Sequence, residues 1–449
     1  MAGGEPLWRG AGAATVGPSG GTVSGAGLQL TIPPGALSGS SELAISAPVS
    51  GVAPSGSLAT GVWKVSGLPL EAARPLSFRL PVASSQLSSG SSLAFLKSES
   101  EPDAGLTVLS ATFRDGHLEA ALPATSATAT SKNADLRAAL IIPEHFTATV
   151  WGMAGFSPIK SPAGRFTVWV PRWDDRDFEA AEATGRILEE ALQKLKAIGI
   201  ETDTRRTTPI DVYLFPFSAL PANMFLLDDG ATGMTESEVW GRGDMGMTLN
   251  LNTYRTNREA FLTTAGHELF HLFQSYYDPR RWAQRTFTGA SWLWMWEAAS
   301  TWFEQKMSAA GTAYLADMTR VNAGFLFRGG LEQPPGLLSA VGARSHGYGA
   351  AMFLQHFIRG NDRRVGDLIR RSAESTGLVV LDFRHTPVDA LRLEDVLLAD
   401  RWIDFCQQYF EGKVHPFIDF KLLTVDDKGK SVVPAYTFAT AADTGTTFR

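Results

Sequence analysis

Hydrophobic and polar positions follow two different periods along the chain. Within residues 1–156 apolar and polar side chains alternate, as in Leu28–Ile32 and Leu76–Leu80. A period of two is typical of half-buried β-strands. Turn signals such as GPSGG, VAPSGS and FRDGH separate the alternating segments. We therefore predict an all-β sandwich domain over residues 1–156.

Strand and helix patterns alternate after residue 156. RFTVWVP, IDVYLFPF and GMTLNLN read as strands. GMTLNLN is expected to border the cleft as an edge strand that pairs with a substrate backbone, and a central strand is the alternative that its pattern leaves open. The predicted helices are Asp177–Ile198, the segment that carries His267, Trp292–Gln305, a helix from Ala350, and Val396–Phe410. The pattern predicts an α/β domain over 157–420 with a mostly helical C-terminal half, and a strand-like extension over 421–449.

The segment GHELFHLFQSYYD places His267 and His271 four residues apart, with Glu268 between them. Positions four apart share one face of a helix, so both imidazoles can reach a single ion. This spacing supplies two zinc ligands and a carboxylate beside them. Two ordinary helical histidines are the alternative that this segment leaves open. Gly266 costs a helix about 1 kcal/mol relative to alanine, which indicates close packing at that position.

A third ligand candidate lies downstream, in WLWMWEAASTWFEQ. Glu297 and Glu304 are seven residues apart in this segment, which is about two helical turns, so both carboxylates point the same way. A helix rich in tryptophan is an unfavourable place for an unpaired charge, and a metal ion would compensate Glu297. The alternative is a buried Glu297 paired with an arginine. We predict Glu297 as a metal ligand and Glu304 as a supporting residue.

The two motifs together resemble those of the gluzincin metallopeptidases. In that family the helix after HExxH carries the third ligand in a W-x-x-E pattern, with a small residue three positions later and an acid seven positions later. The matching residues here are Trp294, Glu297, Ser300 and Glu304. Trp296 and Ala298 flank the third ligand where the aminopeptidase branch has Asn and Gly, which favours an endopeptidase.

The resemblance implies a zincin fold and zinc-dependent hydrolysis of a peptide or protein substrate. Zn²⁺ would be held by His267, His271 and Glu297, and Glu268 would be the general base. Such an enzyme also needs a donor to the developing oxyanion.

The segment RSHGYGAAMFLQHF offers two oxyanion donors, Tyr348 and His346. Glycines on both sides of Tyr348 leave room for close approach, and a helix from Ala350 would place the ring near its N-terminus. We predict Tyr348 as the donor and His346 as its substitute. Packing of the phenol between helices is the alternative.

The stretch Gly17–Ala47, with its Gly-Gly pair and IPPGAL, resembles the opening of ZU5-like β-sandwich domains. That resemblance implies a spacer, docking or substrate-presenting module. The alternatives to an active enzyme are a catalytically inactive pseudo-peptidase and a cell-surface binding or adhesion protein that works through this sandwich.

The composition of the chain limits the classes of binding partner that we expect. The net charge is −6 and no basic block is present, so a nucleic-acid partner is not expected. Apolar runs such as WLWMW are far shorter than the roughly 20 residues of a membrane span. The lone Cys406 excludes an internal disulfide.

No signal peptide is visible at MAGGEPLWRG, but gluzincins with sandwich appendages tend to be exported. We therefore expect an extracellular or cell-surface location, with a cytoplasmic one left open, as is the oligomeric state.

Overall fold

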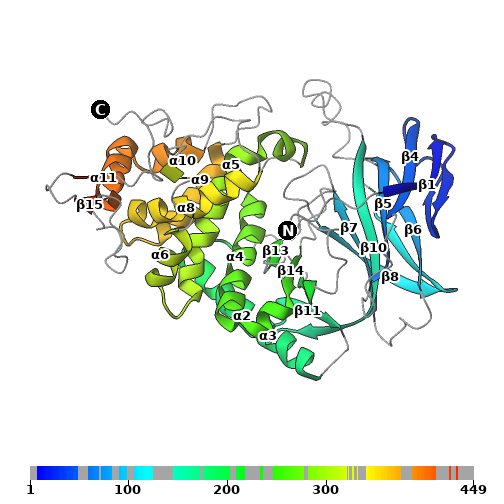
Figure 1. The fold of residues 1–449 in the computed structure, drawn as a ribbon, viewed down its shortest axis with the longest axis horizontal. Helices are drawn as coiled ribbons and strands as arrows, with labels where there is room; N and C mark the ends of the chain where they lie inside the picture. Colours follow the sequence, from blue (N-terminus) through cyan, green and yellow to red (C-terminus); the bar gives the residue numbers. More distant parts are fainter. Residues whose placement is uncertain are drawn as a thin grey trace. The chain divides into compact units, whose positions relative to one another are not determined.

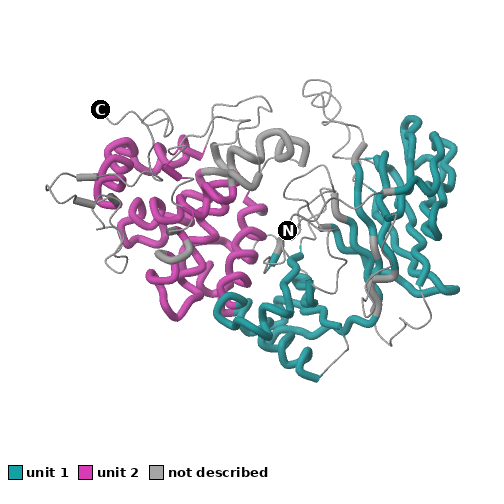
Figure 2. The backbone as a smooth tube through the Cα atoms, viewed as in Figure 1, with its two compact units in different colours: residues 1–189, 208–261 teal, residues 190–207, 262–449 magenta. Residues whose placement is uncertain are grey.

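The computed structural model describes residues 8–48, 59–69, 72–82, 91–98, 106–124, 145–171, 175–202, 209–217, 233–235, 246–277, 282–320, 322, 326–327, 331, 340–375, 387–410, 424–425 and 431–432. The chain divides into two compact units (Figure 2). Unit 1 comprises Met1–Glu189 and Thr208–Phe261, and unit 2 comprises Glu190–Thr207 and Leu262–Arg449. Unit 1 is rich in strands and unit 2 in helices, as the sequence predicts at this coarse level.

The first ten strands of unit 1 are antiparallel wherever they pair with one another (Figure 1). They are β1 (Trp8–Val16), β2 (Gly21–Gly25), β3 (Leu28–Ile32), β4 (Ser41–Pro48), β5 (Ala59–Pro69), β6 (Leu76–Pro81), β7 (Ser91–Ser98), β8 (Leu106–Arg114), β9 (His117–Leu122) and β10 (His145–Lys160). Neighbouring strands are hydrogen-bonded in the order β10-β7-β8-β9-β6-β3-β2. Strand β10 also pairs with β5, and the sheet continues from β5 to β4 and then to β1. Alternate residues of β3 and β6 are buried, which confirms the predicted period of two.

Strand β10 continues beyond the predicted domain boundary. Its residues from Ala148 to Met153 pair with both β5 and β7, and Phe156–Lys160 pair with β11 (Phe166–Pro171). Residue 156 thus lies inside a strand, and the compact units divide elsewhere. Of the C-terminal extension, the structure describes β15 (Thr424–Val425) and β16 (Ser431–Val432), which pair antiparallel. The rest of 421–449 lies outside the described residues.

The second part of unit 1 continues the same sheet beyond β10 with a mixed pairing pattern. Its elements are β11, α2 (Asp175–Ala197, continuing into unit 2), β12 (Ile210–Phe215), β13 (Gly233–Thr235), β14 (Met247–Asn250) and α3 (Leu251–Thr256). Strands β11, β12 and β14 are parallel, and β13 is antiparallel to β14. The expectation that GMTLNLN lies at a free edge is wrong, because β12 and β13 occupy both edges of β14. The strand also ends early, because Asn250 accepts a hydrogen bond from the Asn252 amide at 3.0 Å and caps α3.

Unit 2 is built mainly of helices. They are α4 (Arg258–Tyr277, whose first turn lies in unit 1), α5 (Trp282–Met307), α6 (Thr312–Arg320), α8 (Ala340–Ile358), α9 (Arg363–Ser375), α10 (Pro387–Glu394) and α11 (Leu398–Phe410). The core between α4 and α5 includes Phe270 and Phe303, whose ring centroids are 5.4 Å apart. Close packing at Gly266 is confirmed: a Cβ there would lie 2.5 Å from Met307 Cγ on α5.

Helix α8 begins at Ala340, ten residues before the predicted start at Ala350. His346 and Tyr348 therefore lie within the helix and not at its N-terminus. Gly347 and Gly349 weaken the helical signal of this segment because glycine is a poor helix former. Both glycines face close neighbours in the folded protein, and this tertiary packing accounts for their presence in the helix.

Candidate metal centre

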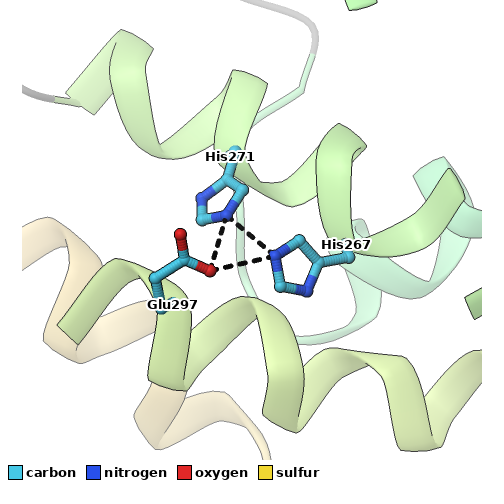
Figure 3. Close-up of side chains that lie close together, drawn as sticks. All are labelled: His267, His271 and Glu297. Atoms are coloured by element: carbon cyan, nitrogen blue, oxygen red, sulfur yellow. Dashed lines mark hydrogen bonds and ion pairs between the residues drawn. The ribbon is translucent and has the colours of Figure 1, made fainter. Parts of the chain in front are cut away.

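Helix α4 presents His267 and His271 on one face, as the four-residue spacing predicts (Figure 3). Their ring centroids lie 4.6 Å apart, and their Nε2 atoms are 2.9 Å apart. His267 is buried and His271 is partly exposed. The two imidazoles therefore turn the same ring atom toward a common point.

Helix α5 brings Glu297 to that point (Figure 3). Glu297 Oε2 lies 3.2 Å from His267 Nε2 and 3.4 Å from His271 Nε2. Four ligands arranged tetrahedrally at the usual zinc distances of about 2.0–2.1 Å would be about 3.3 Å from one another. The three measured separations lie near that value, so the spacing suits a small ion with these atoms as ligands.

The other nitrogen of His267 is held by Glu304, also on α5. Nδ1 lies 2.5 Å from Glu304 Oε1, and both side chains are buried. An ionised carboxylate only accepts hydrogen bonds, so Nδ1 carries a proton and donates it. In the neutral ring the lone pair is then on Nε2, which faces Glu297 and His271.

His271 is oriented by an amide. Its Nδ1 lies 2.9 Å from Gln274 Oε1, and Gln274 Nε2 donates to the Trp296 carbonyl at 3.1 Å. Because the amide nitrogen of Gln274 is used on Trp296, its oxygen faces the imidazole and accepts the proton of Nδ1. The Ser300 hydroxyl lies 3.2 Å from the same Nδ1. His271 thus also has its Nε2 lone pair directed at the centre.

Three electron-pair donors therefore meet at one place: two imidazole Nε2 atoms and one carboxylate oxygen. In their neutral-histidine forms these atoms have no proton to share, so they repel one another unless a cation lies between them. The cation is either a proton or a metal ion. His267, His271 and Glu297 thus form a largely buried group that could hold a metal ion, and the donor set and the spacing fit Zn²⁺.

The pKa directions express the same electrostatics for the protein without metal. Burial lowers the pKa of His267, but hydrogen bonds and charges of Glu297 and Glu304 outweigh it and raise the pKa well above 6.5. Burial raises the pKa of the Glu297 carboxyl, yet the charge of His271 and the hydrogen bonds of both histidines hold it far below its usual range. A proton is thus retained at the centre when no metal is present.

Helix α8 passes α5 closely at Gly347. A Cβ at this position would lie 2.5 Å from Glu297 Cβ and 2.5 Å from the Trp294 carbonyl oxygen. The contact brings Arg344, which comes one turn earlier on α8, to the centre: its Nε lies 3.8 Å from Glu297 Oε1. The guanidinium faces the carboxylate oxygen that points away from the two histidines.

Tyr348 lies beside the centre, and His346 packs on Trp294. The Tyr348 ring centroid is 6.3 Å from that of His267, whereas His346 is fully buried with its ring 5.4 Å from Trp294. The negative charge of Glu297, followed by burial, raises the pKa of Tyr348 well above 10.0. The phenol therefore keeps its proton at neutral pH and is able to donate a hydrogen bond.

Glu268 follows His267 on α4 and is partly exposed. Its negative charge lies near enough to Tyr348 to contribute to the raised pKa of that phenol. Glu268 of α4 and Tyr348 of α8 are thus close enough for the charge of one to act on the hydroxyl of the other.

The sequence patterns assigned no role to two residues that the fold brings to this centre or to its supporting carboxylate, Arg344 and Tyr314. Arg344 precedes Tyr348 by four residues, and a helix extended to Ala340 would have placed both on one face. The close approach predicted at the glycines beside Tyr348 is confirmed at Gly347, which lies against Glu297 and Trp294. Tyr314 on α6 donates to Glu304 Oε2 at 2.6 Å, and no local pattern marks it.

No protein-family model matches the chain, and no curated protein matches it either. Among the described helices, none combines the length and the apolar character that a membrane span requires.

Proposed function

We propose that this protein is a zinc-dependent metallopeptidase whose centre is His267, His271 and Glu297. The observation that carries the proposal is the convergence of two histidine Nε2 atoms and one glutamate oxygen within 3.4 Å of one another. Among the described residues the group has three members. Catalytic zinc sites characteristically use three protein ligands, whereas structural sites use four.

The chemistry follows from the residues around the group. When bound, zinc polarises a carbonyl group and lowers the pKa of water to about 7. Glu268, adjacent to His267, accepts a proton as the general base and passes it to the leaving amine. The protonated Tyr348 phenol donates to the oxyanion that develops on the peptide carbonyl. Arg344 adds a positive charge beside Glu297 in the same region.

The arrangement of motifs and elements supports a gluzincin-type zincin. The HExxH helix follows a mixed sheet in which three strands are parallel and a short antiparallel strand forms the edge. The W-x-x-E helix follows directly. The departure from Asn-Glu-Gly at Glu297 favours endopeptidase activity on a peptide or protein substrate. The N-terminal β-rich part would be a ZU5-like module that docks or presents the substrate, and the natural location would be extracellular or at the cell surface.

The test combines metal analysis with digestion of a broad peptide library. We expect one zinc per wild-type chain and cleavage of the library. Glu268→Gln should keep zinc and fold but lose hydrolysis, because an amide cannot accept the proton. The double variant His267→Ala/His271→Ala should lose both zinc and hydrolysis, and circular dichroism controls for its folding.

Three results would contradict the proposal or part of it. Wild-type protein with only trace metal, even after zinc is supplied, excludes the metal centre. Wild-type protein that binds zinc and cleaves no peptide favours the alternative, a pseudo-peptidase or an adhesion protein that works through its sandwich. Hydrolysis by Glu268→Gln at the wild-type rate assigns the general base to another residue.

A further inference from the structure

Helix α6 contributes a tyrosine to the hydrogen bonds behind His267. The Tyr314 hydroxyl lies 2.6 Å from Glu304 Oε2 and 3.1 Å from Thr263 Oγ1. Thr263 lies on α4 about one turn before His267, and Glu304 Oε1 is hydrogen-bonded to His267 Nδ1. Four side chains from three helices thus form one connected chain of contacts that begins and ends on α4.

Tyr314 completes the partners of a buried carboxylate. Glu304 is 6% exposed, so each of its oxygens needs a donor inside the protein. His267 supplies the donor to Oε1 and Tyr314 supplies the donor to Oε2. The terminal torsion of a glutamate is otherwise soft, with no sharply preferred angle. The phenol therefore fixes the plane of the carboxylate, and with it the direction in which Oε1 meets the imidazole.

We propose that Tyr314 is a positioning residue of the metal centre. By holding Glu304, it keeps the proton of His267 on Nδ1 and aims the Nε2 lone pair at the ion. The inference rests on the part of the proposed function that concerns metal binding and not on peptide hydrolysis. Partners of this kind set the orientation of a ligating imidazole, and their loss typically lowers metal affinity by about 10–100-fold.

The arrangement behind His271 gives a contrast within the same site. Its Nδ1 meets the neutral amide of Gln274, which is itself bonded to the backbone carbonyl of Trp296. Backbone anchoring fixes that amide without a further side chain. Within the described part of the chain, the two oxygens of Glu304 contact the side chains of His267 and Tyr314, so the orientation of His267 depends on a side chain of another helix.

The experiment is Tyr314→Phe in the full chain, because this change removes one hydroxyl and keeps the ring. Tyr409→Phe is the matched control, since Tyr409 is another tyrosine of unit 2 that is largely enclosed by the protein and lies on α11, away from Glu304. Zinc affinity is measured by competition with a chromophoric chelator. The visible absorption of the Co²⁺-substituted protein reports the ligand geometry.

We expect Tyr314→Phe to bind zinc about tenfold more weakly than wild type and to change the cobalt spectrum. Tyr409→Phe should match wild type in both. Should Tyr314→Phe fail to fold, Glu304→Gln tests the same hydrogen bonds. Both His267 and Tyr314 donate to Glu304, and the glutamine amide has one oxygen to accept from one of them and an NH₂ group that faces the other donor.

Tyr314→Phe with wild-type zinc affinity and an unchanged cobalt spectrum would overturn the inference, even if its melting temperature falls. A wild-type protein that binds no metal would overturn it together with the proposed metal centre. A wild-type protein that binds zinc but hydrolyses no peptide would overturn the peptidase proposal alone, and a weakened Tyr314→Phe would still support the role of Tyr314.

Discussion

Helix α8 passes close to α5, the helix that carries Glu297, at Gly347, and this contact leads to a quantitative prediction for Gly347→Ala. The added Cβ would lie 2.5 Å from both Glu297 Cβ and the Trp294 carbonyl oxygen. Apolar contacts normally begin near 3.5–4.0 Å. Neither obstacle is the far end of a flexible side chain, so α8 and α5 have to move apart by about 1 Å.

Two effects of different size follow from this displacement. Overpacking costs about 1–3 kcal/mol, and a unit of this size loses about 2–4 °C of melting temperature per kcal/mol. Metal sites tolerate ligand shifts of only about 0.2 Å. Because the strain acts directly on Glu297, we expect zinc affinity to fall on the order of tenfold or more in addition to the loss of stability.

Gly349→Ala is the matched control for this prediction. A Cβ at position 349 would lie 2.7 Å from the Asn322 carbonyl oxygen and 3.1 Å from Leu326 Cβ, so it strains α8 against a segment that holds no ligand. Both variants should melt earlier than wild type, but only Gly347→Ala should bind zinc more weakly in chelator competition. If the two variants lose stability alike and both keep wild-type zinc affinity, the close packing at Gly347 does not support the centre.

Two further predictions concern the Tyr348 phenol and the pH dependence of zinc binding. Tyr348→Phe should lower kcat by about 10²–10³ with zinc content and KM little changed; an unaltered kcat would remove Tyr348 as the oxyanion donor. The raised pKa of His267 makes the zinc-free protein bind a proton that zinc must displace. This bound proton stabilises the folded zinc-free protein fully below about pH 6.5, and the stabilisation is lost as pH rises through the raised pKa of His267 in the folded state. Zinc affinity should therefore increase as pH rises from about 6.5 through that pKa. A dissociation constant independent of pH from 6 to 9 would contradict this.

The sequence allows the local half of the site to be predicted. His267 and His271 converge because a four-residue spacing sets their positions on one helix, whatever the tertiary structure. Glu297 required a second helix, and it was found through the chemistry of a carboxylate in an apolar segment together with the W-x-x-E resemblance. The close packing at Gly266 also followed from propensity, since an unfavourable residue inside a strong helical pattern indicates a tertiary reason.

The remaining features depend on contacts that leave no local signal. The pattern placed the start of α8 at Ala350 because Gly347 and Gly349 disfavour a helix, whereas packing of those glycines stabilises the helix from Ala340. The partner of β14 at its outer edge is a three-residue strand, β13, which is too short to show a period. Tyr314 is one tyrosine among several until α6 folds against Glu304.

The glycines and the ligands of this centre are linked by geometry. Helices usually pack with their axes about 8–10 Å apart, and the separation depends on the side chains at the contact. At the centre, Gly266 precedes His267 and lies against Met307 and Phe303 of α5, while Gly347 of α8 lies against Glu297. Gly266 thus lets α4 approach α5 near the supporting carboxylate Glu304, and Gly347 lets α8 approach α5 at Glu297. The convergence of Glu297 with the two histidines within 3.4 Å therefore depends on residues that carry no functional group, and helix packing shapes this candidate metal centre as much as its three donor residues do.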